Sequence, residues 1–356
     1  MRKIGHATLS VLLAVVLADN IAVIKHVPCA FPEVEETRID SENMWNNVAG
    51  THLTDEDPEA CENVWMNGMR YSRPQMETGR PYRALFLGCS YTFGLGLNDD
   101  KTYVWRLNEL MPEVEFDNGA VGGYGALQSL IRLRRLMKFK RYDCVIYGAI
   151  ELHLRRSSCP QFRIDGTWEN TGDLNDRCRD LYCLPYTELT SKFEFIDHKL
   201  HRYYFPGATF SPLCNLIAQY YGVHDVLHKY QPDVHEQRLI FASHMNRMAQ
   251  VAAAYGSKFL LVSLDGAPAF DDASLYSPMV KYFNNRFYKD IEAQDRVRHM
   301  EVNHPGAEVN DYWARKLAHF LSQPENFASL IQHADNDGQN HRTLYDLERQ
   351  EVSWPW

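Results

Sequence analysis

Short apolar runs alternate with amphipathic segments in the first half of the chain. RALFLG (83–88), VEFDN (114–118) and YDCVIYG (142–148) have the length and composition of strands. Between them, residues 102–111 and 125–138 place apolar side chains at helical spacing. This β-α-β-α-β order predicts a mostly parallel sheet covered on both faces, that is, a three-layer α/β/α fold.

The pattern lapses after about residue 151 and resumes near residue 235 with a helix, a strand over 257–264 and a helix over 307–321. The intervening stretch bears cysteines and is too long for a structureless loop, so we expect an insertion or subdomain. The expected organisation is a signal peptide or anchor (1–24), an N-terminal extension (25–80), a main domain (81–322) with an insertion at about 152–234, and a polar C-terminal tail (323–356).

The N-terminus has the layout of an export signal. Arg2 and Lys3 precede an apolar run over 7–18, as in secretory signals. Apolar character resumes at 21–24, so the alternative is an uncleaved segment that attaches residues 7–24 to the membrane. We therefore expect an exported protein, periplasmic or extracellular.

Cysteine content and charge refine this picture. Eight cysteines fit an exported chain with disulfides, and the segment around Cys159, Cys178, Cys183 and Cys214 is the richest in them. Their pairing cannot be deduced from the sequence. The net charge of −9 argues against a protein that neutralises nucleic-acid phosphates. No CxxC or HExxH spacing indicates a metal site.

The stretch FLGCSYTFG places Ser90 directly after a buried strand, where ligands of parallel sheets bind. A serine becomes a nucleophile when a histidine oriented by a carboxylate takes its proton. EVNHPG (301–306) offers both, since Glu301 lies three residues before His304. The backbone N–H of Ser90 and a glycine N–H in AVGGYG (120–125) are candidate donors to an oxyanion.

These segments resemble the blocks of SGNH, or GDSL-type, hydrolases. GCSYTFG (88–94) resembles the first block, GDSxTxG, and Asn118 with Gly123 resembles the second. Glu301, His304 and Pro305 match the fifth block, DxxHP. NGMR, just before the main domain, is similar to a segment of the exported members found with polysaccharide-modifying machinery.

The resemblance implies that Ser90 attacks an ester carbonyl, most simply an O-acetyl group on a carbohydrate or exopolysaccharide. His304 is then the base, Glu301 its orienting carboxylate, and the N–H groups of Ser90 and Gly123 form the oxyanion hole. No metal or organic cofactor is required. Water as acceptor gives an esterase, whereas a sugar hydroxyl gives an O-acetyltransferase supplied by a membrane-bound acyl donor protein.

The chain departs from the family pattern at three positions. Cys89 replaces the first-block aspartate, Glu301 replaces an aspartate, and Ile150 stands where the third block, GxND, has the asparagine that donates to the oxyanion. These changes leave open a non-catalytic glycan-binding or assembly protein. Asn118 and His153 are candidates for side chains that face the substrate, and His153 is also a candidate replacement for the missing donor.

Overall fold

The computed structural model describes residues 37–40, 44–47, 49–53, 61–76, 78–164, 181–203, 230–285, 300–301 and 304–331. By the density of internal contacts the chain forms two units, one of Asn47–Ser157 with Val234–Trp356 and one of Met1–Asn46 with Ser158–Asp233. The predicted signal or anchor (1–24) lies outside the described residues. Within those residues, no helix has both the length and the apolar character needed to cross a membrane.

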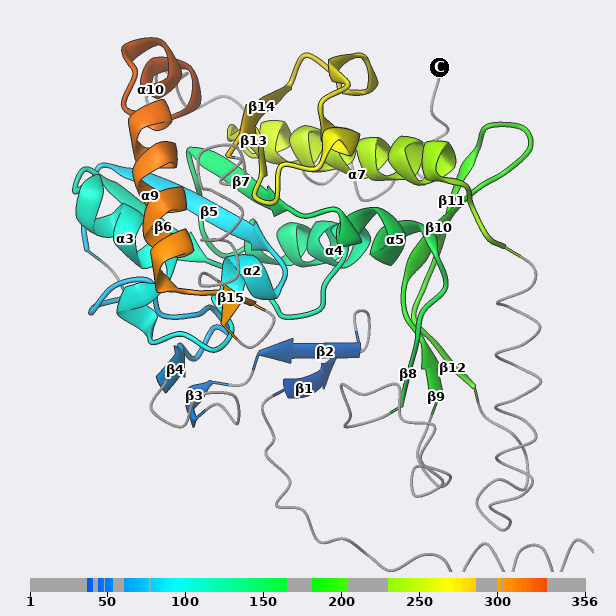
Figure 1. The fold of residues 1–356 in the computed structure, drawn as a ribbon, viewed down its shortest axis with the longest axis horizontal. Coiled ribbons are helices and arrows are strands. Elements are labelled where there is room, and N and C mark those ends of the chain that lie inside the picture. The colour runs from blue at the N-terminus through cyan, green and yellow to red at the C-terminus, as the bar shows by residue number, and fades with distance from the viewer. Residues whose placement is uncertain are drawn as a thin grey trace, which may run out of the picture. The chain divides into compact units, whose positions relative to one another are not determined.

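The larger unit is built on a five-stranded sheet in which every neighbouring pair is parallel (Figure 1). Its order is β14-β13-β7-β5-β6, with bounds β5 Tyr82–Gly88, β6 Val114–Asn118, β7 Cys144–Ala149, β13 Lys258–Ser263 and β14 Val280–Asn284. The first strand along the chain therefore lies between the second and the third. This order has its switch point between β5 and β7, where open α/β sheets bind ligands. The predicted α/β fold class is confirmed.

Helices cover both faces of this sheet (Figure 1). On one face, α3 (Tyr103–Leu110) and α9 (Ala307–Leu321) bury an apolar cluster that includes Trp313. On the other face, α4 (Ala126–Leu136) and α7 (Val234–Ala254) form a second cluster. The central strands are buried on both sides, which explains why their sequences read as continuous apolar runs.

The edge strand β6 is covered by the segment that precedes β5. The Arg70 N–H donates to the Asn118 carbonyl at 3.0 Å, and the Ser72 hydroxyl donates to the Phe116 carbonyl at 2.7 Å. Next to this segment lie the strands β3 (Gly50–Leu53) and β4 (Cys61–Val64), which pair antiparallel. The stretch before residue 81 is therefore partly an integral piece of the sheet unit.

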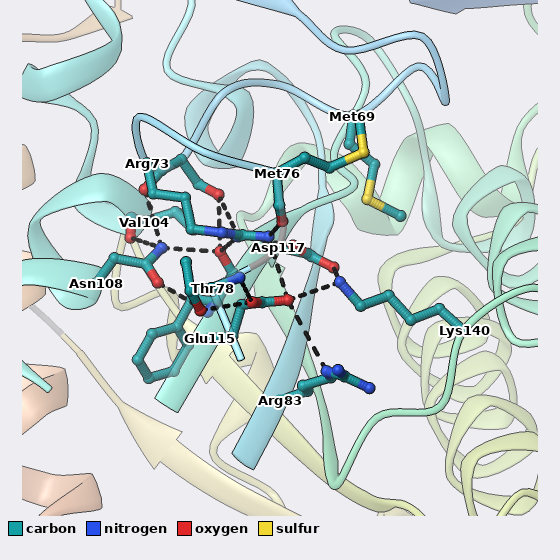
Figure 2. A network of polar contacts seen from close by, with 12 residues as sticks. Met69, Arg73, Met76, Thr78, Arg83, Val104, Asn108, Glu115, Asp117 and Lys140 are labelled. Atoms are coloured by element: carbon teal, nitrogen blue, oxygen red, sulfur yellow. Dashed lines mark hydrogen bonds and ion pairs between the residues drawn. The ribbon is translucent and has the colours of Figure 1, made fainter. Parts of the chain in front are cut away.

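Two carboxylates on β6 are buried in this covered edge and neutralised there (Figure 2). Arg73 lies 3.2 Å from Glu115 and 2.7 Å from Asp117, and Lys140 lies 2.7 Å and 2.8 Å from the same two side chains. Thr78 adds its N–H at 2.9 Å and its hydroxyl at 2.6 Å to Glu115. Although burial opposes it, these donors and cations hold the pKa of Glu115 down at about 2.

The other helices in the described part of this unit are α2 (Ser90–Phe93), α5 (Leu152–Ser158) and α10 (Pro324–Leu330), with short 3₁₀ turns at Asp99–Lys101, Pro268–Phe270 and Ala273–Leu275. The strands β15 (Met300–Glu301) and β16 (His304–Pro305) form a small antiparallel pair. The packed core continues past the expected boundary at 322, because α10 and the next residue bury Leu330 and Ile331.

The smaller unit contains short strands: β1 (Thr37–Asp40), β2 (Met44–Asn47), β8 (Phe162–Ile164), β9 (Leu181–Cys183), β10 (Tyr186–Leu189), β11 (Phe195–His198) and β12 (His201–Tyr203). β10 and β11 pair antiparallel, and β9 lies between β8 and β12. Among the described residues no disulfide is found: Cys183, in the segment expected to carry disulfides, is a buried free thiol, and Cys61 is free as well. Cys89 and Cys144, which lie at or in the apolar strands, are buried free thiols. Cys29, Cys178 and Cys214 lie outside the described residues.

Candidate active site

Ser90 is the first residue of the one-turn helix α2, directly beyond the carboxyl end of β5. Cys89 stands at the N-cap position, and Ser90 is buried, with 6% of its surface exposed. Thr92, on the same turn, packs against Gly88 and its register partner Gly148, where an added Cβ would clash with the Thr92 hydroxyl. Because Gly88 and Gly148 have no side chain, α2 can pack closely against the ends of β5 and β7.

His304 is brought to the serine from the far end of the chain. Its Nε2 lies 3.1 Å from the Ser90 Oγ, which is hydrogen-bonding distance for a nucleophile and its base. The histidine lies on β16, just before Gly306 caps α9. The Tyr91 ring meets the imidazole edge-on at 5.8 Å between centroids and restricts its position.

The backbone places Glu301 directly opposite His304. β15 and β16 pair antiparallel with Glu301 in register with His304. The predicted pair therefore meets across a short hairpin in front of α9. The side chain of Glu301 lies outside the described part of the structure.

The carboxyl end of α2 is held by two buried side chains. Asn118 donates through its amide to the Thr92 carbonyl at 2.9 Å. Arg70 donates to the carbonyls of Gly94 at 3.1 Å and Leu97 at 2.5 Å. Gly94 ends the helix with φ at 81°, a left-handed conformation that suits glycine. The segment that follows Ser90 is therefore held in place by hydrogen bonds from Asn118 and Arg70.

Arg70 is itself fully buried and held by carboxylates. It lies 3.1 Å from Asp99 and 3.3 Å from Glu62, and its guanidinium stacks over the Phe93 ring at 4.7 Å. In the sequence, Arg70 is the last residue of NGMR, a segment that was noted only because it resembles one in exported members of the family. The network explains why an arginine stands there: a planar group with several donors can bind two carbonyls and two carboxylates together.

The second proposed oxyanion donor, Gly123, lies in the loop between β6 and α4. Its φ of 74° is a left-handed conformation, which favours glycine. This loop is tied to the end of β5, because the Val121 N–H donates to the Gly88 carbonyl at 3.3 Å. The loop that carries Gly123 is thus attached two residues before Ser90.

The other predicted site residues are buried. Asn118 is 0% exposed, and its side-chain amide donates to the Thr92 carbonyl of α2. His153 on α5 is also 0% exposed, with Nδ1 2.9 Å from the Tyr147 hydroxyl. Ile150 is 3% exposed and belongs to the apolar cluster, so its side chain supplies no donor.

Asp265, which the sequence did not single out, holds the backbone of the turn after β7. It follows β13, and its carboxylate accepts from the Glu151 N–H at 2.6 Å and from the Ala267 N–H at 3.1 Å. Burial raises the pKa of Asp265. The signal available in the sequence was an aspartate before glycine, right after a buried strand. Its bond to Glu151 fixes the turn that follows β7.

Within the described ranges, no group of three or more histidine, cysteine, aspartate or glutamate side chains is placed to hold a metal ion. The side chains that the structure brings within hydrogen-bonding distance of each other here are those of Ser90 and His304.

No protein-family model matches the chain, and no curated protein matches it. Solved structures that resemble it include a member of the lipolytic G-D-S-L family from Veillonella parvula (9% identity, 68% of this chain and 99% of that chain, TM-score 0.36). Another is the psychrotrophic esterase EstA from Pseudoalteromonas sp. (11% identity, 68% of this chain and 98% of that chain, TM-score 0.36). A third is a catalytic mutant of Axe2, an acetylxylan esterase from Geobacillus stearothermophilus (10% identity, 69% of this chain and 97% of that chain, TM-score 0.35). At these identities and scores, none of them carries an argument about what this chain does.

Proposed function

We propose that the protein is a serine-dependent esterase of the SGNH type. The observation that carries this proposal is the 3.1 Å approach of the His304 Nε2 to the Ser90 Oγ, two residues 214 positions apart in the chain. Ser90 also starts a helix at the switch point of a parallel sheet, where a substrate would have access to it.

In the proposed reaction, the Ser90 Oγ bonds to the ester carbonyl carbon while its proton passes to the His304 Nε2. The backbone N–H groups of Ser90 and Gly123 stabilise the oxyanion. The C–O bond to the alcohol then breaks, and the alcohol leaves with the proton from His304. Glu301, opposite His304 on the hairpin, orients the ring and stabilises its charged form. Water repeats the cycle and releases the acid.

The substrate class follows from the resemblance given by the sequence blocks. We propose an O-acetyl ester on a carbohydrate or exopolysaccharide, met outside the cytoplasm by an exported or membrane-anchored protein. The alternative is an O-acetyltransferase that forms the same acyl-enzyme. In that case a membrane-bound protein supplies the acyl group, and a sugar hydroxyl accepts it in place of water.

Intact-mass measurement after treatment with a fluorophosphonate tests the nucleophile. We expect one adduct on the full chain, and none on Ser90→Ala or His304→Ala. Ser322→Ala, at an exposed serine of the same unit, is the control and should be labelled like the parent. No adduct on a folded parent would refute the esterase proposal and favour the non-catalytic glycan-binding alternative.

The acceptor is tested separately. The purified protein is incubated with an acetylated xylan oligosaccharide, with and without a non-acetylated acceptor glycan, and free acetate and acetylated acceptor are measured. Acetate release that needs no acceptor supports the esterase. Transfer to the acceptor without matching acetate release supports the acetyltransferase.

A further inference from the structure

His153 has one ring nitrogen in use and one without a partner. Its Nδ1 lies 3.3 Å from the Ile150 backbone nitrogen and 2.9 Å from the Tyr147 hydroxyl. Its Nε2 is buried and makes no hydrogen bond. Leaving a buried polar group unpaired is costly, so a ligand atom that pairs with it would be stabilising.

The unpaired atom is a donor. The Ile150 N–H can only donate, so Nδ1 accepts from it and carries no proton. Burial, reinforced by the positive charge of Arg156, lowers the pKa of His153 well below its ordinary value. The ring is therefore neutral with its single proton on Nε2, and among the residues that the structure describes this N–H has no acceptor within hydrogen-bonding distance.

This donor is close to the place where the family's third-block asparagine is missing. Ile150 occupies the asparagine position, and its own N–H is the group bonded to the His153 ring. The strand β7 ends one residue earlier and pairs with β5, with Gly148 opposite Gly88, two residues before Ser90.

The helix that carries His153 also adjoins the loop of the other proposed donor. The α5 backbone packs on Gly125, where an added Cβ would lie 2.9 Å from the Arg156 Cβ. The Ser157 hydroxyl accepts from the Ala126 N–H at 2.9 Å. The helix that carries His153 thus contacts the start of α4, next to the loop of Gly123, while the His153 ring itself contacts Tyr147 and the Ile150 N–H.

We propose that the Nε2–H of His153 donates to the oxyanion of the reacting ester, in place of the absent asparagine. The inference rests on the esterase function proposed above. As Ser90 bonds to the carbonyl carbon and its proton moves to His304, the carbonyl π electrons move onto the oxygen, which accepts from Nε2–H of His153 and from the N–H groups of Ser90 and Gly123. His153 keeps its proton throughout and returns to an unpaired donor when the carbonyl re-forms.

The test compares variants of the full chain in hydrolysis of p-nitrophenyl acetate. His153→Phe keeps a planar ring without the donor, and His153→Gln keeps an amide donor. Arg155→Gln is the matched control, an exposed substitution on the same helix. We expect His153→Phe to lose about 10²–10³ in kcat with KM nearly unchanged, the loss typical of one oxyanion donor. His153→Gln should recover most of it, and Arg155→Gln should equal the parent.

A second measurement uses the parent alone, so that the inference does not depend on the folding of a variant. The ¹⁵N and ¹H resonances of the His153 Nε2–H are followed by NMR while the serine is trapped with an alkyl boronic acid. A downfield proton shift on trapping supports the inference. An unchanged resonance in a trapped protein overturns it, and so does a kcat within about threefold of the parent in a folded His153→Phe.

The two proposals fail differently. If the parent forms no fluorophosphonate adduct, the esterase proposal fails. If the parent is labelled and active but His153→Phe has the same kcat as the parent, only the present inference fails. Adding Ile150→Asn to His153→Phe gives a last discriminator, since the asparagine should restore part of the lost kcat if a donor is what the site lacks.

Discussion

Replacing Arg70 by methionine tests whether the buried network beneath α2 stabilises the fold as the structure indicates. The guanidinium is 0% exposed and lies between Glu62 and Asp99, which are also buried. Removing it leaves two buried carboxylates without their cation and frees the carbonyls of Gly94 and Leu97. Breaking a buried ion pair from one side costs about 3–5 kcal/mol, so we expect Arg70→Met to lose about that much free energy of unfolding.

The loss of stability in Arg70→Met should also depend on pH, because Glu62 titrates differently without its cation. Burial already raises the pKa of Glu62, and Arg70 opposes the rise. Without Arg70 the folded-state pKa lies further above the unfolded one, so stability falls as the pH rises through it. The deficit of Arg70→Met relative to the parent should therefore be largest near pH 7 and smaller near pH 5.

Urea unfolding followed by tryptophan fluorescence at the two pH values measures both quantities. Lys101→Met is the control, because Lys101 pairs with Asp100 at 3.2 Å with both side chains about half exposed, and such surface pairs contribute about 0–1 kcal/mol. A loss below about 1 kcal/mol for Arg70→Met, or an equal loss at both pH values, would refute the reasoning.

Three further changes are predicted. Glu115→Gln should lower the free energy of unfolding by about 3 kcal/mol at neutral pH, because the folded pKa of Glu115 is about 2 and the ordinary value is 4.5. Since the folded pKa is depressed, the difference from the parent should vanish as the pH falls from about 4.5 towards 2, which urea unfolding at a series of pH values measures. A pH-independent difference would contradict this. Gly148→Ala should clash with the Thr92 hydroxyl, destabilise by about 1–3 kcal/mol and slow fluorophosphonate labelling of Ser90; a parent-like melting temperature and labelling rate would contradict it. Asn118→Leu removes the 2.9 Å bond to the Thr92 carbonyl and should slow labelling in a protein that still folds, as judged by circular dichroism; unchanged labelling would show that Asn118 does not position the serine.

The sequence predicted those parts of the structure that local pattern controls. The strand expected at VEFDN is β6 with the same bounds, and the helix expected at 307–321 is α9 with the same bounds. The approach of Ser90 to His304 was predicted from the blocks and the rule that the carboxyl ends of parallel strands meet at one edge, and the 3.1 Å distance agrees with it.

Features that depend on distant partners were not predictable. Glu115 and Asp117 are charged residues on a strand buried at all five positions, and periodicity alone could not show that Arg73 and Lys140 neutralise them. The same holds for Asp265, whose partner on the Glu151 backbone is 114 residues away in the chain. Cysteine content favoured disulfides, whereas Cys183 is a free thiol, and burial raises the pKa of this thiol to about 12.

The covered edge of β6 bears on where this domain begins. An open edge strand offers unpaired N–H and C=O groups to any other chain, and proteins avoid aggregation by covering it. Here the cover is supplied by residues that precede the first sequence block, through Arg70 and Ser72. A protein trimmed to start at residue 81 would keep every proposed catalytic residue, yet it would present a bare strand carrying Glu115 and Asp117 without Arg73. The edge of this sheet is therefore completed by residues well upstream of Ser90, which the sequence blocks alone do not reveal.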